Sequence, residues 1–323
     1  MTEILPVDDA LPRAVALLRA GEVVAVPTET VYGLAGDATN GDAVARIFEA
    51  KGRPSFNPLI VHVASMEMGE AIADFDPLSR RLAKAFWPGP LTLVLPLGVD
   101  SEIHPLVTAG LDTVALRMPR GFAARLIAAL GRPLAAPSAN SSGRVSATTA
   151  RAVADDLGGR IPLVVDGGAT PVGLESTIVR VVGGRVFLLR PGGVAAGDIE
   201  AAAGVPVERG AKGVQAPGML ASHYAPGAAV RTDASSVRDG EALLAFGPGR
   251  IAGAERARAV LNLSPHGDLR EAAANLFSHL HALDRSGATT IAVEPVPHAG
   301  LGEAINDRLA RAAAPREAPA APE

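Results

Sequence analysis

A short basic loop, Lys51-Gly52-Arg53-Pro54-Ser55-Phe56-Asn57-Pro58, carries the residues of this chain that are best suited to binding an anion. Arginine presents a planar fork that matches phosphate or carboxylate, and lysine adds a compact positive charge. The glycine and the prolines restrict the loop, so both cations are held on a stiff support. Any single Lys-x-Arg could also be a basic turn exposed to solvent. Only the other segments of the chain can favour an anion-binding loop over such a turn.

Two further polar segments follow expected strands. Residues 22–26 read as a short buried strand that ends in 27–34, where three hydrogen-bonding side chains stand in a row. A buried-looking run at 133–137 ends abruptly in 138–143, whose serines, asparagine and open amides suit an anion or a base edge. Ligands in α/β folds usually bind at strand ends. The same residue types also favour plain turns and helix caps, so this reading stays open.

Two more candidates lie on strands themselves. In the expected strand 113–119, alternation puts Thr113, Ala115 and Arg117 on one face and the larger apolar residues on the other. The side chain of Arg117 either lies exposed at a sheet edge or extends into a cleft. His62 lies in the strand 59–63, where a structural histidine is favoured over a catalytic one on this evidence alone.

The elements expected to position these residues alternate between strands and helices, which is typical of an α/β protein. Expected helices are one capped by Asp8 or Asp9 and closed by Gly21, then 42–50, 76–86, 122–130, 149–157 with Ser146 and Thr148 as caps, 269–284 with a capping box at Asp268 and Glu271, and 303–313. Further expected strands are 91–95, 163–165, a hairpin of 176–182 and 185–190, then 242–246, 259–263 and 289–293. The residues alone thus predict a basic cleft lined by Ser, Thr and Asn, suited to a polyanion and a small polar molecule.

The composition argues against several classes of function. The 323 residues carry a net charge of −4 and include only 3% aromatics, so the chain offers neither a global basic field nor a base-stacking platform for nucleic acid. It has no cysteine, which excludes disulfides and thiolate metal sites. The start is acidic without a signal pattern, and no apolar run is long enough to span a bilayer, so we expect a cytoplasmic protein without membrane contact. P-loop, dinucleotide-binding, zinc-protease and hydrolase-elbow motifs are missing.

Taken together, the polar segments resemble the YrdC-like family, and more closely its two-domain L-threonylcarbamoyladenylate synthases. The resemblance covers almost the whole chain apart from both ends, and the joint order of its pieces is far more specific than any one piece. The matching pieces are Pro27-Thr28-Glu29-Thr30-Val31-Tyr32-Gly33-Leu34, Lys51-Gly52-Arg53-Pro54 with Asn57-Pro58-Leu59 and His62, Pro88-Gly89-Pro90-Leu91-Thr92, Arg117-Met118-Pro119, Ser138-Ala139-Asn140 with Ser142-Gly143 and Ser146, Glu175-Ser176-Thr177, Leu189-Arg190-Pro191-Gly192, Pro217-Gly218-Met219 and His223-Tyr224-Ala225-Pro226.

The resemblance implies a twisted mixed sheet with helices that forms a concave cleft, followed by a smaller Rossmann-like parallel α/β domain. We expect a catalytic domain at 1–204 and a linker at 205–230, where Gly, Pro and Ala dominate and which would fold over the site as a lid. The small domain is expected at 231–313, and the tail 314–323 is expected to be disordered.

The activity implied by the resemblance is that of a nucleotidyltransferase. L-threonine, bicarbonate or CO2, and ATP would give threonylcarbamoyl-AMP and pyrophosphate. A partner transferase would then pass the threonylcarbamoyl group to an adenosine beside the tRNA anticodon; contact of this chain with tRNA is compatible with the role and not required by it. The implied cofactor is Mg2+ held mainly by ATP, with no metal ligands from the protein.

The resemblance also assigns residues to each substrate. Around ATP it places Arg53, Asn57, Thr113, Ser138, Asn140, Ser146, Arg190 and Tyr224. Around L-threonine it places Thr30, His62, Arg117, the backbone at Ala136, and Ser176. Lys51 and Arg53 are the implied catalytic pair, because they would offset phosphate charge as pyrophosphate leaves.

Two alternatives stay open at this stage. An RNA-binding module could grip a nucleic-acid backbone in the same cleft, but the scarcity of aromatics and the negative net charge disfavour it. A carbamoyltransferase of the same fold could use carbamoyl phosphate as its donor. Relatives of that kind carry zinc-finger parts, which this cysteine-free chain lacks.

Overall fold

The computed structural model describes residues 1–54, 56–210 and 223–315, which form two compact units. The first unit contains residues 1–142 and 146–210, and the second contains 143–145 together with 223–315. The short segment 143–145 joins the second unit because Ala225 donates its backbone N–H to the carbonyl oxygen of Gly143, 2.9 Å away.

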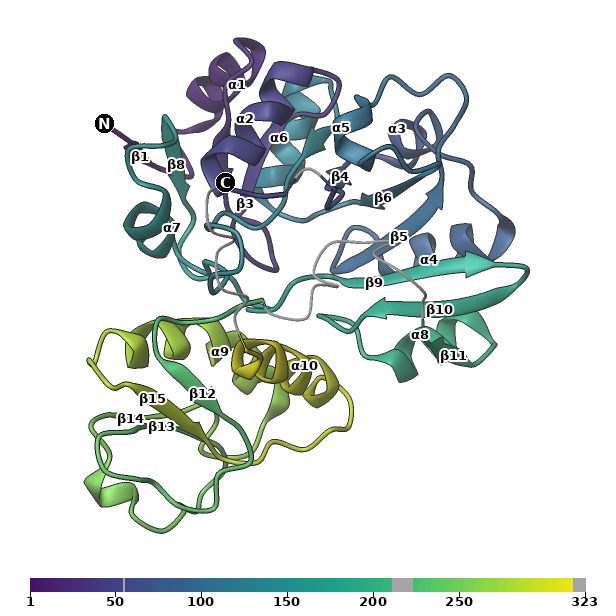
Figure 1. Cartoon of the computed structure of the whole chain (residues 1–323). Coiled ribbons are helices and arrows are strands. Elements are labelled where there is room, and N and C mark those ends of the chain that lie inside the picture. Colours follow the sequence, from purple (N-terminus) through teal and green to yellow (C-terminus); the bar gives the residue numbers. More distant parts are fainter. Residues whose placement is uncertain (55, 211–222, 316–323) are drawn as a thin grey trace, which may run out of the picture. The chain divides into compact units, whose positions relative to one another are not determined.

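The first unit is built on a mixed sheet, for which eleven strands are described (Figure 1). Its strand order is β1-β8-β2-β3-β7-β4-β6-β5-β9-β10-β11. The strands are β1 (Glu3–Pro6), β2 (Val24–Val26), β3 (Gly33–Asp37), β4 (Ile60–His62), β5 (Leu91–Pro96), β6 (Thr113–Arg117), β7 (Leu134–Ala135), β8 (Leu163–Asp166), β9 (Thr177–Val182), β10 (Arg185–Arg190) and β11 (Val207–Arg209). The helices are α1 (Leu11–Arg19), α2 (Gly41–Lys51), α3 (Met66–Glu70), α4 (Pro77–Phe86), α5 (Pro105–Thr108), α6 (Phe122–Leu130), α7 (Ala150–Leu157) and α8 (Ala196–Ala203).

The pairing of β4 with β6 fixes the centre of this sheet. The two strands are parallel, and their register sets His62 opposite Arg117 and Ile60 opposite Ala115. Paired residues on neighbouring strands share a face, so His62 and Arg117 lie side by side on one face of the sheet. The predicted alternation along 113–118 is thereby confirmed.

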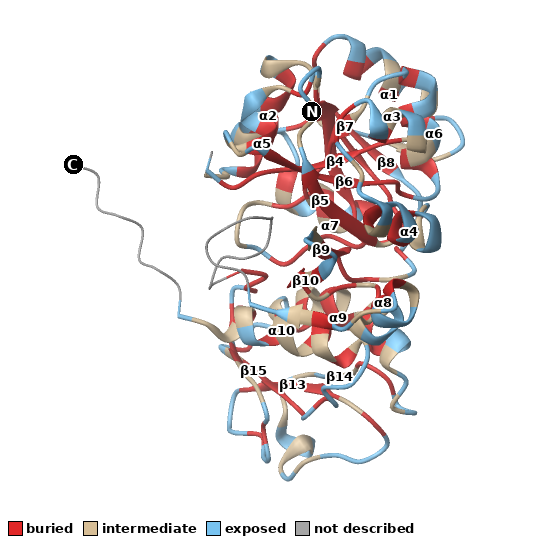
Figure 2. Cartoon of the chain, turned by 90° about the vertical axis from the view of Figure 1, so that its right-hand side faces the viewer, coloured by how far each residue is buried: buried red, intermediate tan, exposed pale blue. Residues whose placement is uncertain are grey.

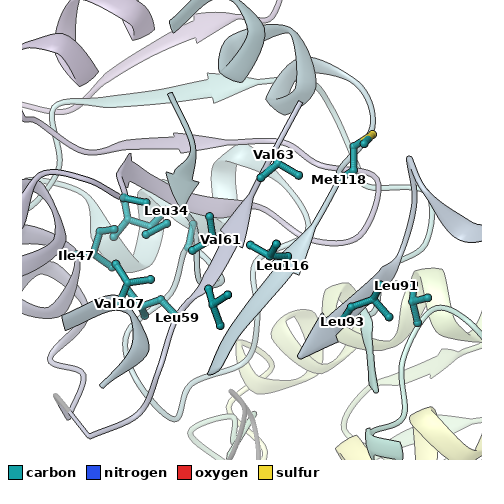
Figure 3. Close-up of a cluster of buried hydrophobic side chains, with 14 of the residues drawn as sticks. Leu34, Ile47, Leu59, Val61, Val63, Leu91, Leu93, Val107, Leu116 and Met118 are labelled. Carbon is teal, nitrogen blue, oxygen red and sulfur yellow. The ribbon is translucent and has the colours of Figure 1, made fainter. Parts of the chain in front are cut away.

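The main core lies on the opposite face. Leu34 from β3, Val61 from β4 and Leu116 from β6 pack together there, with Ile47 of α2 and Val107 of α5 over them (Figure 3). Figure 2 shows the strands buried and the outer faces of the helices exposed. On the His62 face, the β2–β3–β7 part of the sheet packs against α1 and α6. The β4–β6–β5–β9 part instead carries a small apolar cluster formed by Ile60, Val94, Ala115, Ile178 and Leu189.

The second unit is a smaller parallel α/β domain. Four strands are described for its sheet, in the order β12-β15-β13-β14, and all three pairings are parallel. Its elements are β12 (Ala229–Arg231), β13 (Ala242–Ala245), the 3-10 turn η1 (Ala254–Arg256), β14 (Val260–Asn262), α9 (Leu269–Asp284), β15 (Thr290–Val293) and α10 (Gly302–Ala313). The expected fold class, a large twisted mixed sheet followed by a small Rossmann-like domain, is confirmed.

Three expected helix caps are wrong in detail. The first helix begins after Ala10, which makes no side-chain cap, because residues 6–10 already form a turn in which Asp9 and Ala10 donate to the Pro6 carbonyl. Thr149, rather than Ser146 or Thr148, caps α7 by accepting from the N–H of Ala152. Asp268 does cap α9, but Glu271 accepts from the hydroxyl of Ser264 instead of reaching back to Asp268.

The range 205–230, expected as a linker, contains β11 near its start, where it pairs with β10 of the first unit. Its end contains the first residues of β12, which pairs with β15 of the second unit. Residues 211–222, including the Pro217-Gly218-Met219 piece of the expected lid, lie outside the described residues, as do residues 316–323 of the expected tail. None of the helices in the described part of the chain is both long and apolar enough to cross a membrane.

Candidate active site

Arg117 is the centre of a buried polar cluster at the end of β6. Its Nη1 donates to the hydroxyl of Thr30, 2.8 Å away, and its Nε donates to the carbonyl oxygen of Gly89, 3.2 Å away. The carboxylate oxygen Oε1 of Glu29 lies 2.7 Å from Nη2. A second hydroxyl, that of Thr28, lies 2.8 Å from the hydroxyl of Thr30. A cation on the His62 face of the sheet is thus held by three neighbours and surrounded by groups that can bind a small polar molecule.

His62 stands beside Arg117 as a neutral imidazole. Burial of the ring, together with the nearby charge of Arg117, lowers the pKa of His62 to about 3. Among the described residues, nothing hydrogen-bonds its Nδ1 atom. A buried polar atom normally has a partner, so this nitrogen is a candidate contact for a ligand.

Ser176 joins Thr92 to Arg190. Its hydroxyl lies 2.7 Å from the hydroxyl of Thr92, and Arg190 donates through Nη2 to both the carbonyl oxygen (2.8 Å) and the hydroxyl (3.2 Å) of Ser176. Both Ser176 and Arg190 are buried. The guanidinium of Arg190 is therefore held in place by the residue expected to contact the amino acid.

Lys51 ends α2 and points into the turn formed by residues 138–142. Its Nζ donates to the carbonyl oxygens of Ser138 (2.6 Å) and Asn140 (2.5 Å), and Ser142 donates its N–H to the carbonyl oxygen of Lys51 (2.8 Å). Burial is the main cause that lowers the pKa of Lys51 well below its ordinary value, and the charge of Arg53 adds to it. Gly52 allows this geometry because it terminates the helix with a left-handed φ of 58°.

The rest of the basic loop folds back on itself. Arg53 donates to the carbonyl oxygens of Asn57 (3.2 Å) and Pro58 (2.9 Å). The side chain of Asn57 is buried, and within the described part of the chain neither its oxygen nor its nitrogen has a hydrogen-bond partner. Ser55 of this loop lies outside the described residues.

Three more expected contacts lie in the same unit. Ser146 is buried and donates to the Glu175 carboxylate, whose charge also acts on Lys51. Ala136 donates its N–H to the carbonyl oxygen of Ile60, 3.0 Å away. Thr113 begins β6, two positions before Ala115 and four before Arg117 on the same face.

Tyr224 is the one expected contact that belongs to the second unit. It is buried there, with its ring 5.7 Å from the ring of Phe277 and 4.1 Å from that of His223. The guanidinium of Arg308 lies 4.8 Å from the centre of the Tyr224 ring. The expected role of Tyr224 at ATP stays a prediction.

No role was predicted for Glu29, Thr92 and Glu175, although all three lie inside the matched segments. Each of them is adjacent to a chosen residue in sequence or in space: Glu29 precedes Thr30, Glu175 precedes Ser176, and Thr92 contacts Ser176. A glutamate that is buried usually has a partner. This rule could have pointed to Glu29 and Glu175, because both stand next to chosen residues inside the matched segments. In the described ranges, no group of three or more His, Asp or Glu side chains is placed to hold a metal ion.

Comparisons with known proteins show the family of this chain. Residues 16–192 match the telomere recombination family model, which covers the Sua5, YciO and YrdC proteins, and residues 194–314 match the C-terminal domain of threonylcarbamoyl-AMP synthase. The threonylcarbamoyl-AMP synthase of Bacillus subtilis is 43% identical over 96% of this chain and 94% of its own length. That of Pyrococcus abyssi is 43% identical over 93% of this chain and 92% of its own.

Solved structures show the same relationship. The crystal structure of P. abyssi Sua5 complexed with L-threonine matches 97% of this chain and 98% of its own, with a TM-score of 0.87 and 40% identity. Escherichia coli YciO, at 20% identity and a TM-score of 0.53, shares the fold over 59% of this chain and 96% of its own. The chain belongs to the threonylcarbamoyl-AMP synthase family, whose members are enzymes that use ATP to make an adenylate. The resemblance drawn from the sequence is confirmed.

Proposed function

We propose that this enzyme converts L-threonine, bicarbonate or CO2, and ATP to threonylcarbamoyl-AMP and pyrophosphate. The product supplies the threonylcarbamoyl group that a partner transferase places on the adenosine next to the tRNA anticodon. The names of the relatives and the L-threonine bound to P. abyssi Sua5 support this proposal.

The observation that carries the proposal is the short segment 134–140, which links the two polar clusters. At its start, Leu134 pairs with His62 of β4, beside Arg117. At its end, the carbonyl oxygens of Ser138 and Asn140 accept from Lys51. An amino acid held near Arg117 and a nucleotide held near the basic loop would therefore be neighbours within one unit.

The chemistry needs alignment and charge neutralisation more than a protein nucleophile. The amino group of threonine captures CO2 as a carbamate, and a carbamate oxygen then attacks the α-phosphorus of ATP, from which pyrophosphate leaves. Two anions must approach each other in this step, so fixed cations lower its barrier. Arg53 and Lys51 offset the charge of the phosphates, and Arg117 binds the carboxylate of threonine.

The buried polar atoms without partners support the same assignment. An unsatisfied buried donor or acceptor costs about 1–3 kcal/mol, and both side-chain polar atoms of Asn57 and the Nδ1 atom of His62 are in this state within the described residues. Bound ATP would satisfy Asn57, and bound threonine would satisfy His62. Mg2+ would be held mainly by the phosphates of ATP, where it would add positive charge, and we propose no protein ligands for it.

Mass spectrometry of the reaction products tests the proposal. The purified protein with ATP, bicarbonate and L-threonine should form a product with the mass of threonylcarbamoyl-AMP, together with pyrophosphate, and omission of any one substrate should abolish it. Arg53→Ala should remove this activity, whereas Arg151→Ala, at an exposed ion pair on α7, should not. Turnover that survives without bicarbonate when carbamoyl phosphate is supplied would contradict the proposal and favour a carbamoyltransferase.

A further inference from the structure

Glu29 is a buried carboxylate that the mechanism above does not use. Its side chain is 8% exposed, and that of its partner Arg117 is 4% exposed. The other carboxylate oxygen, Oε2, accepts the backbone N–H of Arg120 at 3.0 Å. Because Arg117 is fixed in turn by Gly89 and Thr30, both charged groups are held rigidly.

The contact between the two charges leaves hydrogen-bonding capacity unused on both sides. Glu29 Oε1 and Arg117 Nη2 are 2.7 Å apart, yet the N–H directions do not point along this line, and neither atom has a hydrogen-bond partner among the described residues. Arg117 Nη2 can therefore still donate hydrogen bonds, and Glu29 Oε1 beside it can still accept them. A buried ion pair of this kind is costly unless further hydrogen bonds complete it.

A free α-amino acid is the complement of such a pair. It carries a carboxylate, which accepts from a guanidinium, and an ammonium group, which donates only. We propose that Glu29 binds the amino group of the amino-acid substrate while Arg117 binds its carboxylate. The assignment rests on the proposed function, and it adds the group that recognises the atom to be carboxylated.

Charge balance gives this arrangement a selectivity. The Glu29–Arg117 pair is neutral as a whole, and so is a zwitterionic amino acid, so binding adds no net charge to a buried site. An acid of the same shape without the amino group would bring an uncompensated negative charge next to Glu29. Repulsion of this kind discriminates between ligands that are otherwise alike.

The experiment compares two ligands on two proteins. Calorimetry measures the affinities of L-threonine and of 3-hydroxybutanoate, which lacks only the amino group, for the wild type and for Glu29→Gln. Glu22→Gln is the matched control, since Glu22 forms a half-exposed ion pair with Arg46 away from the cluster. ATP binding by each variant reports that the first unit is folded.

In Glu29→Gln the affinity for L-threonine should fall at least tenfold, while that for 3-hydroxybutanoate should stay unchanged or rise. Equal losses for both ligands would show that Glu29 only holds Arg117 in place, and unchanged threonine binding would remove it from the site; either result overturns the proposal. If the variant does not fold, the two ligands are compared on the wild type alone. There the proposal requires 3-hydroxybutanoate to bind at least tenfold more weakly than threonine, and equal affinities would overturn it. A wild type that does not bind threonine at all would instead contradict the proposed function.

Discussion

The ammonium group of Lys51 lies 2.5 Å from the backbone carbonyl oxygen of Asn140, a residue 89 positions further along the chain. A second carbonyl oxygen, that of Ser138, takes another of its N–H groups. The lysine of the basic loop therefore shapes the 138–142 turn, in addition to any contact with phosphate. If nearby phosphates keep the lysine protonated, its three donors would leave one for a nucleotide.

Replacing Lys51 by methionine should disturb that turn as well as the binding of ATP. Each hydrogen bond from a charged donor contributes roughly 1.5–3 kcal/mol, and the change removes the Lys51 donor from the carbonyl oxygens of Ser138 and Asn140. We expect ATP affinity to fall at least tenfold and the amides of 138–142 to exchange their hydrogens faster. Calorimetry and hydrogen exchange measure the two effects; unchanged exchange in the turn would mean that Lys51 acts on the nucleotide alone.

Replacing Asn57 should weaken ATP binding without destabilising the fold. Its buried amide has no partner within the described residues, so Asn57→Leu removes a group that costs about 1–3 kcal/mol to bury. The free energy of unfolding should stay the same or rise, while ATP affinity should fall at least tenfold. Urea unfolding and calorimetry measure the two quantities.

Asn306 provides the control for that experiment. Its Nδ2 group has three carbonyl oxygens within hydrogen-bond distance, those of Val296, Pro297 and Gly302. Asn306→Leu should therefore destabilise the protein, since it removes a side-chain donor that these carbonyl oxygens share, and should leave ATP affinity alone. Equal stability losses at both asparagines would contradict the view that Asn57 is kept for a ligand.

The neutral state of His62 predicts how stability depends on pH. The folded protein holds the pKa of His62 at about 3, against an ordinary value of 6.5, so between these values the unfolded chain binds a proton that the folded one does not. Stability is therefore lost as pH falls below about 6.5, by up to about 1.4 kcal/mol per pH unit from this group. His62→Asn should flatten the decline of the urea midpoint between pH 6.5 and 4.5. A variant that loses stability as steeply as the wild type would contradict this origin.

The second unit offers a test of its own. Glu294 is buried and accepts the backbone N–H groups of Phe246 and Ile251, at 2.8 and 3.0 Å. Glu294→Ala removes the acceptor of these two partly buried amides and should destabilise this unit by roughly 2–5 kcal/mol. Hydrogen exchange should accelerate in β13 and the loop after it, whereas threonine binding should persist. Loss of threonine binding would show that the first unit depends on the folding of the second.

The sequence predicted the elements whose patterns are strong and local. Helices α6 and α9 begin and end as expected, because their apolar stripes are regular and their ends carry Gly131 or Asp268. The hairpin of β9 and β10 is confirmed as well. Strand β3 was missed, since two glycines interrupt it and burial along its whole length hides the alternation that marks a half-exposed strand.

The residues of the site were visible in the sequence, but their partners were not. Contacts such as Lys51 with Asn140 and Arg117 with Thr30 join positions 89 and 87 residues apart, and no local pattern encodes them. The pairing of Glu29 with Arg117 likewise depends on the order of strands in the sheet. Residue types therefore identified which side chains could bind an anion, and the fold decided which of them meet.

A crystal structure with L-threonine and a non-hydrolysable ATP analogue bound together would show whether both substrates share one site. We expect threonine between Glu29 and Arg117, with its amino group facing the α-phosphate of a nucleotide held by Arg53, Asn57 and the 138–142 turn. Two ligands lodged at separate places, or a nucleotide that does not approach residues 51–58, would contradict it.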